Sequence, residues 1–156
     1  MHGVTITELI EKFKLRNTTP DIDTDKIVLT HPDVNRPALQ LTGFFDHFDR
    51  ERVQIIGYVE QAYINTMERD VKRMMYEKLT SSQIPCLVFS RDQEPDEDLL
   101  EYCSYYGVPC LVSKKTTSSL MAEVIRWLNV KLAPCISIHG VLIDVFGEGV
   151  LIMGES

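Results

Sequence analysis

Two apolar pentads decide the fold of this chain: Ile84-Pro85-Cys86-Leu87-Val88 and, 24 residues later (84 to 108), Val108-Pro109-Cys110-Leu111-Val112. Each pentad is followed by a polar stretch and then by an amphipathic segment, over 96–106 and 118–130. Strand–helix–strand–helix order with short links is typical of parallel β-α units. Because such crossovers are right-handed, the two strands should lie side by side in one parallel sheet. The repeat therefore predicts an α/β fold.

Hydrophobic spacing predicts the elements on the N-terminal side of this repeat. We expect helices over 5–14 and 64–79, strands over 26–30 and 53–58, a loop over 17–25 and a turn over 33–37. In the second helix, apolar residues recur at steps of three and four: Met67, Val71, Met74, Met75 and Leu79. We interpret this stripe as core packing, and a Met-rich docking groove is the alternative.

Composition narrows the class of protein. The 156 residues carry 23 acidic and 16 basic side chains, a net charge of −7, and 44% of them are hydrophobic, as in soluble globular proteins. The acidic balance, without a basic stripe, argues against nucleic-acid binding. No apolar run is long enough to span a membrane and no signal peptide leads the chain, so we expect a cytoplasmic protein.

The four cysteines predict no zinc site, because they form no C-x-x-C pair and no histidine lies at ligand spacing. Three of the cysteines directly follow a proline and have apolar neighbours: Cys86, Cys110 and Cys135. Apolar surroundings of this kind are typical of buried, reduced thiols. We predict no metal-binding residue in the chain.

A change in composition near residues 130–134 divides the chain into an α/β domain over 1–131 and the start of a second domain over 132–156. From Cys135 to Met153 the residues are strand-like on both sides of Gly147-Glu148-Gly149, which predicts a β-hairpin. An apolar strand then ends at Gly154-Glu155-Ser156, as strands do at the opening of a phosphate-binding P-loop. Only three of the eight P-loop positions are present, so an ordinary strand-to-turn junction is the alternative.

His139 is the other candidate for chemistry. On an alternating strand it shares a face with Ser137, opposite Ile136 and Ile138. It is either a half-exposed strand histidine or a titrating group near a phosphate.

The chain resembles bacterial HPr kinase/phosphorylase along its whole length. The motifs that carry the resemblance are Asp33-Val34-Asn35-Arg36-Pro37, Leu41-Thr42-Gly43-Phe44-Phe45, Arg52-Val53-Gln54-Ile55-Ile56-Gly57, Ile84-Pro85-Cys86 and the run from His139-Gly140-Val141-Leu142 to Gly154-Glu155-Ser156. Ala38 stands where this family usually has glycine. The last block is the most specific, since a His-Gly-Val-Leu hairpin leading into a P-loop characterises the family.

The resemblance implies a Mur-ligase-like N-terminal domain, with a mixed or parallel sheet and flanking helices, followed by the opening hairpin of a P-loop kinase domain. It implies a hexameric, bifunctional protein-serine kinase and phosphorylase that acts in carbon catabolite repression. The family uses ATP or pyrophosphate with Mg²⁺ to phosphorylate a serine of HPr, the carrier protein of the phosphotransferase system, and also phosphorolyses seryl-phosphorylated HPr.

By resemblance, His139 falls on an active-site position, and Gly154, Glu155 and Ser156 fall on the nucleotide-binding loop. The P-loop lysine and the Mg²⁺ ligands have no counterpart up to Ser156, so we expect the 156-residue chain itself to be inactive. The alternative is a non-catalytic module that senses a ligand or mediates assembly.

Overall fold

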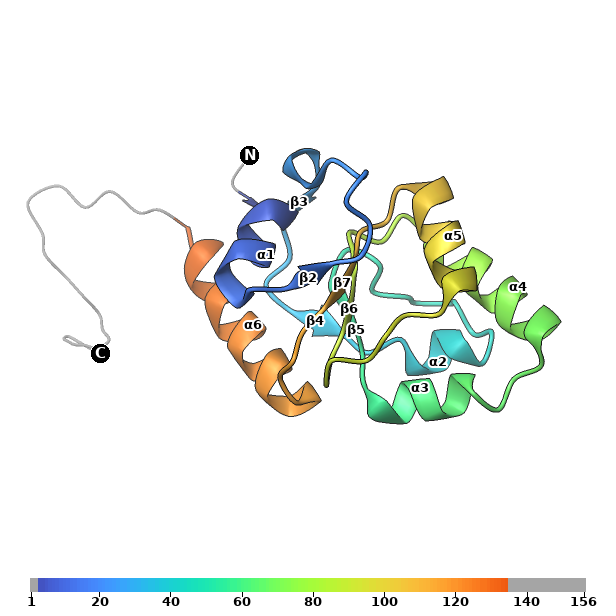
Figure 1. Ribbon diagram of the computed structural model, residues 1–156. Coiled ribbons are helices and arrows are strands. Elements are labelled where there is room, and N and C mark those ends of the chain that lie inside the picture. The colour runs from blue at the N-terminus through green and yellow to red at the C-terminus, as the bar shows by residue number, and fades with distance from the viewer. Residues whose placement is uncertain (1–2, 135–156) are drawn as a thin grey trace, which may run out of the picture.

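A computed structural model describes residues 3–134. Its centre is a five-stranded sheet in the order β2-β7-β6-β5-β4 (Figure 1). The strands are β2 (Arg16–Asn17), β4 (Val34–Asn35), β5 (Val53–Ile56), β6 (Leu87–Phe89) and β7 (Cys110–Val112). Strands β4 to β7 are parallel, whereas β2 pairs with β7 in the antiparallel sense. Two further short strands, β1 (Val4–Thr5) and β3 (Val28–Leu29), form a separate antiparallel pair.

Helices cover both faces of the sheet. They are α1 (Ile6–Phe13), α2 (Ala38–Leu41), α3 (Tyr58–Ile64), α4 (Arg69–Thr80), α5 (Glu97–Tyr106) and α6 (Thr117–Lys131), with a 3-10 turn, η1, at Thr24–Lys26. Helices α1 and α6 lie on one side of the sheet and α2 to α5 on the other (Figure 1). The molecule is therefore a three-layer α/β domain.

Successive side chains of a strand point to opposite faces of the sheet, so each strand contributes to two separate parts of the core. On β5, Ile55 packs with α1 and α6, whereas its neighbour Ile56 packs with the helices of the opposite face. On β6, Val88 joins the first cluster and Phe89 the second. These strands are buried on both faces, which explains their continuous apolar sequence.

Local signals explain where the first helix begins and ends. Thr5 caps α1 through its side-chain oxygen, which accepts from the backbone N–H of Glu8, while the Glu8 carboxylate accepts from the backbone N–H of Thr5. The helix ends at Lys14, in the left-handed conformation with φ 53°. The predicted helix over 5–14 is thus confirmed.

The structure confirms the α/β fold class and the pairing of the repeated pentads. Strands β6 and β7 are parallel neighbours, with Leu87 opposite Cys110 and Phe89 opposite Val112, and α5 connects them. Cys86 and Cys110 are buried free thiols, as predicted, and Cys103 is a third. The same prediction for Cys135 lies outside the described residues. The predicted hairpin over 135–153 lies outside the described residues, and the domain boundary at 131–132 stays a prediction.

Several predicted elements differ from those of the structure. Residues 33–37 contain β4, which pairs with β5, instead of only a turn, because a two-residue strand is fixed by its neighbour in space. The predicted helix over 64–79 is wrong at its start, since α3 ends at Ile64 and α4 begins at Arg69. Within that helix, Met75 and Leu79 are buried, whereas Val71 and Met74 face solvent. Helices α2 and α3 were not predicted.

None of the helices within residues 3–134 combines the length and the apolar character that crossing a membrane requires.

Candidate functional site

The residues that sequence reasoning assigned to chemistry are His139, Gly154, Glu155 and Ser156, and all four lie outside the described residues. Their roles stay predictions. Within residues 3–134, the candidate sites lie at the two ends of the parallel strands and on the surface around α2.

A polar cluster occupies the carboxyl ends of the parallel strands, which is where open α/β sheets usually bind ligands. Arg36 follows β4, and Gly57 follows β5 and begins α3. Glu60, on the first turn of α3, is 6% exposed. One of its carboxylate oxygens, Oε1, accepts from Arg36 Nη2 at 2.7 Å and from the Gly57 backbone N–H at 2.7 Å. A buried carboxylate thereby ties β4 to the start of α3.

Two hydroxyl groups beside this cluster connect the end of β6 to α6, which lies on the opposite face of the sheet. Ser90, directly after β6, and Thr117, the first residue of α6, share a hydrogen bond of 2.6 Å between Oγ and Oγ1. A Cβ on Gly57 would lie 2.7 Å from Thr117 Oγ1 and 2.9 Å from Arg36 Nη2. The carboxyl edge above β5 is thus closely packed at Gly57 and leaves no room there for a side chain.

The chain leaves β6 through two consecutive residues with positive φ, Arg91 at 58° and Asp92 at 54°. Non-glycine residues adopt this conformation at a cost, so surrounding contacts must fix it. The Asp92 N–H donates to Ser113 O at 2.7 Å, and the Arg91 N–H donates to Lys115 O at 2.8 Å. These bonds hold the turn against the start of α6.

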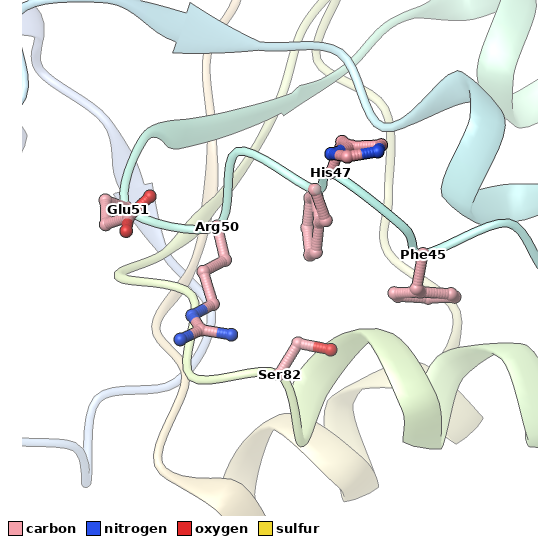
Figure 2. A pocket seen from close by; sticks show the side chains of 6 residues that line it. Phe45, His47, Arg50, Glu51 and Ser82 are labelled. Carbon is pink, nitrogen blue, oxygen red and sulfur yellow. The ribbon is translucent and has the colours of Figure 1, made fainter.

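A pocket of about 410 Å³ opens at the other end of the strands, and Figure 2 shows it. It lies between the segment that leads into β5 and the end of α4, and its lining comprises Phe45, His47, Phe48, Arg50, Glu51 and Ser82. The Phe45 and Phe48 rings meet edge to face at 5.5 Å. His47 has a φ of 61°. Aromatic rings beside a guanidinium suit a flat or anionic ligand, but no nucleophile paired with a base is present among these lining residues.

Three further hollows surround α2, with volumes of about 310, 260 and 220 Å³. The first two share Leu41 and Thr42, the first and third share Gln40, and the second and third share Ala38. The three hollows therefore border the same short helix. The first two are lined mainly by apolar side chains.

Charged groups elsewhere form structural contacts between helices. Asp98 on α5 accepts from Arg69 at 3.0 Å and from Arg73 at 2.9 Å, both on α4. The hydrogen bond from Arg69 is the main cause that lowers the pKa of Asp98 below its ordinary value of 3.8. Burial, followed by the nearby Asp96, raises the pKa of Tyr76. These groups connect α4 to α5, and Arg73 also lines a hollow of about 280 Å³ with Glu77, Glu101, Tyr102 and Tyr105.

Two of the buried thiols, Cys86 and Cys103, are unsuited to nucleophilic chemistry at neutral pH. Burial raises the pKa of Cys86, and a hydrogen bond with Cys110, together with burial, raises the pKa of Cys103. Among residues 3–134 there is also no group of three or more histidine, cysteine or acidic side chains that could hold a metal ion.

Sequence reasoning missed the Arg36–Glu60 cluster, although a signal for it was present. Gly57 precedes Glu60 by three residues, which is the spacing of an N-terminal cap, yet Gly57 was interpreted only as the end of a strand. Arg36 was placed in a turn because it precedes Pro37.

The described residues define a three-layer α/β domain with a mixed five-stranded sheet. Its three layers resemble the crystal structure of the CBS and DRTGG domains of the regulatory region of Clostridium perfringens pyrophosphatase, complexed with the activator diadenosine tetraphosphate. The TM-score is 0.60 at 9% identity, covering 89% of this chain and 53% of that one, so the likeness concerns the fold alone.

The chain belongs to the family described as HPr Serine kinase N terminus, whose sequence profile matches residues 4–128. It is 60% identical over all 156 residues to the HPr kinase/phosphorylase of Lachnoclostridium phytofermentans, and 41% identical to that of Caldicellulosiruptor bescii. In each comparison the match covers 100% of this chain and 50% of the relative. The chain thus spans about half the length of the curated relatives it matches.

Proposed function

We propose that this chain is the N-terminal half of an HPr kinase/phosphorylase. The complete enzyme would phosphorylate a serine of HPr with ATP or pyrophosphate and would phosphorolyse the seryl-phosphorylated product. The observation that carries the proposal is the match over all 156 residues to relatives of that name, at up to 60% identity. That match extends through residues 135–156, beyond the region of the family profile.

In this proposal, the residues near the C-terminus open the catalytic site. Gly154, Glu155 and Ser156 would begin the loop whose backbone N–H groups surround the phosphates, and His139 would lie near the reacting phosphoryl group. Phosphoryl transfer depends on positioning and on neutralising charge, mainly by a lysine and by Mg²⁺. Because the positions for that lysine and for the Mg²⁺ ligands come after Ser156, we propose that the 156-residue chain alone is inactive.

HPr as partner, assembly into a hexamer, a cytoplasmic location and a role in carbon catabolite repression belong to the same proposal. Their support is the name shared by the relatives and the sequence motifs that carry the resemblance.

A chimaera tests this proposal directly. Residues 1–156 would be joined to the remaining half of the Lachnoclostridium phytofermentans relative, and serine phosphorylation of HPr would be followed with ATP and Mg²⁺. We expect phosphorylation by the chimaera, none by the 156-residue chain, and a large loss in a His139→Ala chimaera. His31→Ala, at a histidine of the described half that lines none of the hollows given above, is the matched control. A folded chimaera without activity beside an active parent enzyme would refute the assignment, and activity of the 156-residue chain would refute its predicted inactivity.

The alternative proposal is a ligand-sensing or assembly module without chemistry of its own. The mainly apolar hollows beside α2, which could take a ligand or a partner, favour this role for residues 3–134. The chimaera separates the two proposals, because a folded but inert chimaera is the result expected for a module.

A further inference from the structure

The pocket of about 410 Å³ is formed mainly by one irregular segment, residues 44–52, which connects α2 to β5. Its lining combines two aromatic rings, a guanidinium, an imidazole, a carboxylate and a hydroxyl. Sites that bind small molecules usually have volumes of about 300–1,000 Å³ and a few convergent polar groups beside apolar ones. The pocket therefore has the size and the mixed lining that a small organic ligand requires.

Internal contacts hold this segment in one conformation. The buried Gln54 donates from Nε2 to the carbonyl oxygens of Asp49 and Arg52, both at 2.9 Å. The Arg52 guanidinium also lies 3.5 Å from the Asp49 carboxylate. His47 has a φ of 61°, and non-glycine residues in such conformations cluster at functional sites. The pocket is thus preformed, so that binding would not have to order the segment first.

Two charged side chains of the lining have no partner among residues 3–134. Along Asp49-Arg50-Glu51-Arg52 the outer two residues pair with each other, whereas Arg50 and Glu51 form no ion pair and no side-chain hydrogen bond within that range. Arg50 extends toward Ser82, and Phe45 lies on the opposite side of the opening (Figure 2). A guanidinium with free donors suits a phosphate group, which it can bind through two parallel hydrogen bonds.

The aromatic rings give the pocket a flat, apolar part. Phe45 and Phe48 meet edge to face at 5.5 Å, and both pack against the core cluster on the α2 to α5 side of the sheet, which fixes their positions. Lys78 Nζ lies 4.6 Å from the centre of the Phe45 ring and adds a second positive charge close to the pocket. Nucleobases stack on aromatic side chains, because every base has a flat π face.

From these observations we infer that the pocket binds a nucleoside monophosphate. The base would stack on Phe45 and Phe48, the phosphate would bind Arg50, and the ribose hydroxyls would donate to Glu51, as they do to acidic residues at other nucleotide sites. A single phosphate fits best, because further phosphates would be repelled by the Glu51 carboxylate beside Arg50. The inference does not rest on the proposed kinase function, since none of these residues belongs to the predicted loop at residues 154–156.

Calorimetric titration of the 156-residue chain with AMP, GMP, CMP and UMP, without Mg²⁺, tests the inference. We expect at least one of the four to bind with a Kd below about 1 mM. The corresponding nucleoside, which lacks the phosphate, and ribose 5-phosphate, which lacks the base, should each bind about tenfold more weakly or less. Saturation by ribose 5-phosphate as tight as by the nucleotide would show that the rings take no part, and would overturn the inference.

Two variants assign the binding to this pocket. Arg50→Ala should weaken nucleotide binding about tenfold or more and leave nucleoside binding unchanged, because only the phosphate contacts Arg50. Phe45→Leu should weaken the binding of both. Arg126→Ala, at an exposed arginine of α6 on the other face of the sheet, is the matched control and should change neither. Circular dichroism verifies that each variant is folded.

Two results would refute the inference outright. One is the lack of binding of all four nucleotides at about 1 mM, and the other is nucleotide binding that Arg50→Ala leaves as tight as Arg126→Ala does. Because the readout is the heat of binding to the 156-residue chain, it is independent of the kinase assay. A chimaera that phosphorylates HPr would not rescue a pocket that binds no nucleotide, and an inert chimaera would not exclude one that does.

Discussion

Removing the Arg36 side chain tests how strongly the carboxyl edge of the sheet depends on a buried ion pair. Arg36→Ala would leave the Glu60 carboxylate, 6% exposed, with the Gly57 N–H as its remaining partner within 3–134. Breaking a fully buried pair costs about 3–5 kcal/mol. The Arg36 side chain is 35% exposed, so water can partly replace it, and we expect a loss of about 2–3 kcal/mol in the free energy of unfolding.

The measurement is urea unfolding at one fixed protein concentration. Trp127, the single tryptophan, reports on it because its ring packs edge to face on Phe13 at 5.5 Å. Arg16→Ala is the matched control: Arg16 pairs with Glu94 at 2.8 Å, but the two side chains are 48% and 71% exposed. That pair should contribute less than about 1 kcal/mol, and less at high salt. If the two variants lose the same free energy, burial does not determine the strength of the Arg36–Glu60 pair and the reasoning is refuted.

Three further outcomes are expected. Gly57→Ala should cost about 1–3 kcal/mol in urea unfolding, because the new methyl group would overlap Thr117 Oγ1 at 2.7 Å; an unchanged midpoint would show that the edge is loosely packed. Asp98→Asn should lower Tm at neutral pH through loss of the Arg69 contact. Since the pKa of Asp98 is lowered on folding, the Tm difference should vanish as the pH falls through that pKa, and a constant difference would contradict this. Thr5→Ala should cost about 1 kcal/mol by removing the α1 cap, and Thr5→Ser should restore it.

The sequence was most informative where one segment determines its own structure. The repeated pentads became β6 and β7, because apolar runs between turn residues suit strands buried on both faces. The start of α1 was also predictable, since its cap lies within four residues along the chain.

Elements fixed by distant contacts could not be predicted in the same way. Strand β4 has only two residues, and its conformation depends on pairing with β5. The predicted helix began five residues before α4, because Ile64, Met67 and Val71 keep helical spacing across the break between α3 and α4. The exposure of Met74 was also beyond sequence reasoning, since spacing shows that residues share a face but not whether a neighbour covers it.

The way the first and last elements meet has a consequence for synthesis on the ribosome. Arg16 pairs with Val112, and α6 packs against β4 and β5. Strand β2 and part of one face of the sheet therefore lack their partners until segments much later in the chain have been translated. Until Lys131 has emerged from the exit tunnel, Ile55, Val88 and Leu111 lack the part of their cover that α6 provides beside α1. A nascent chain that pauses before α6 would therefore expose apolar side chains of the sheet, which chaperones bind. Residues 3–134 can complete their fold only after α6 has been translated.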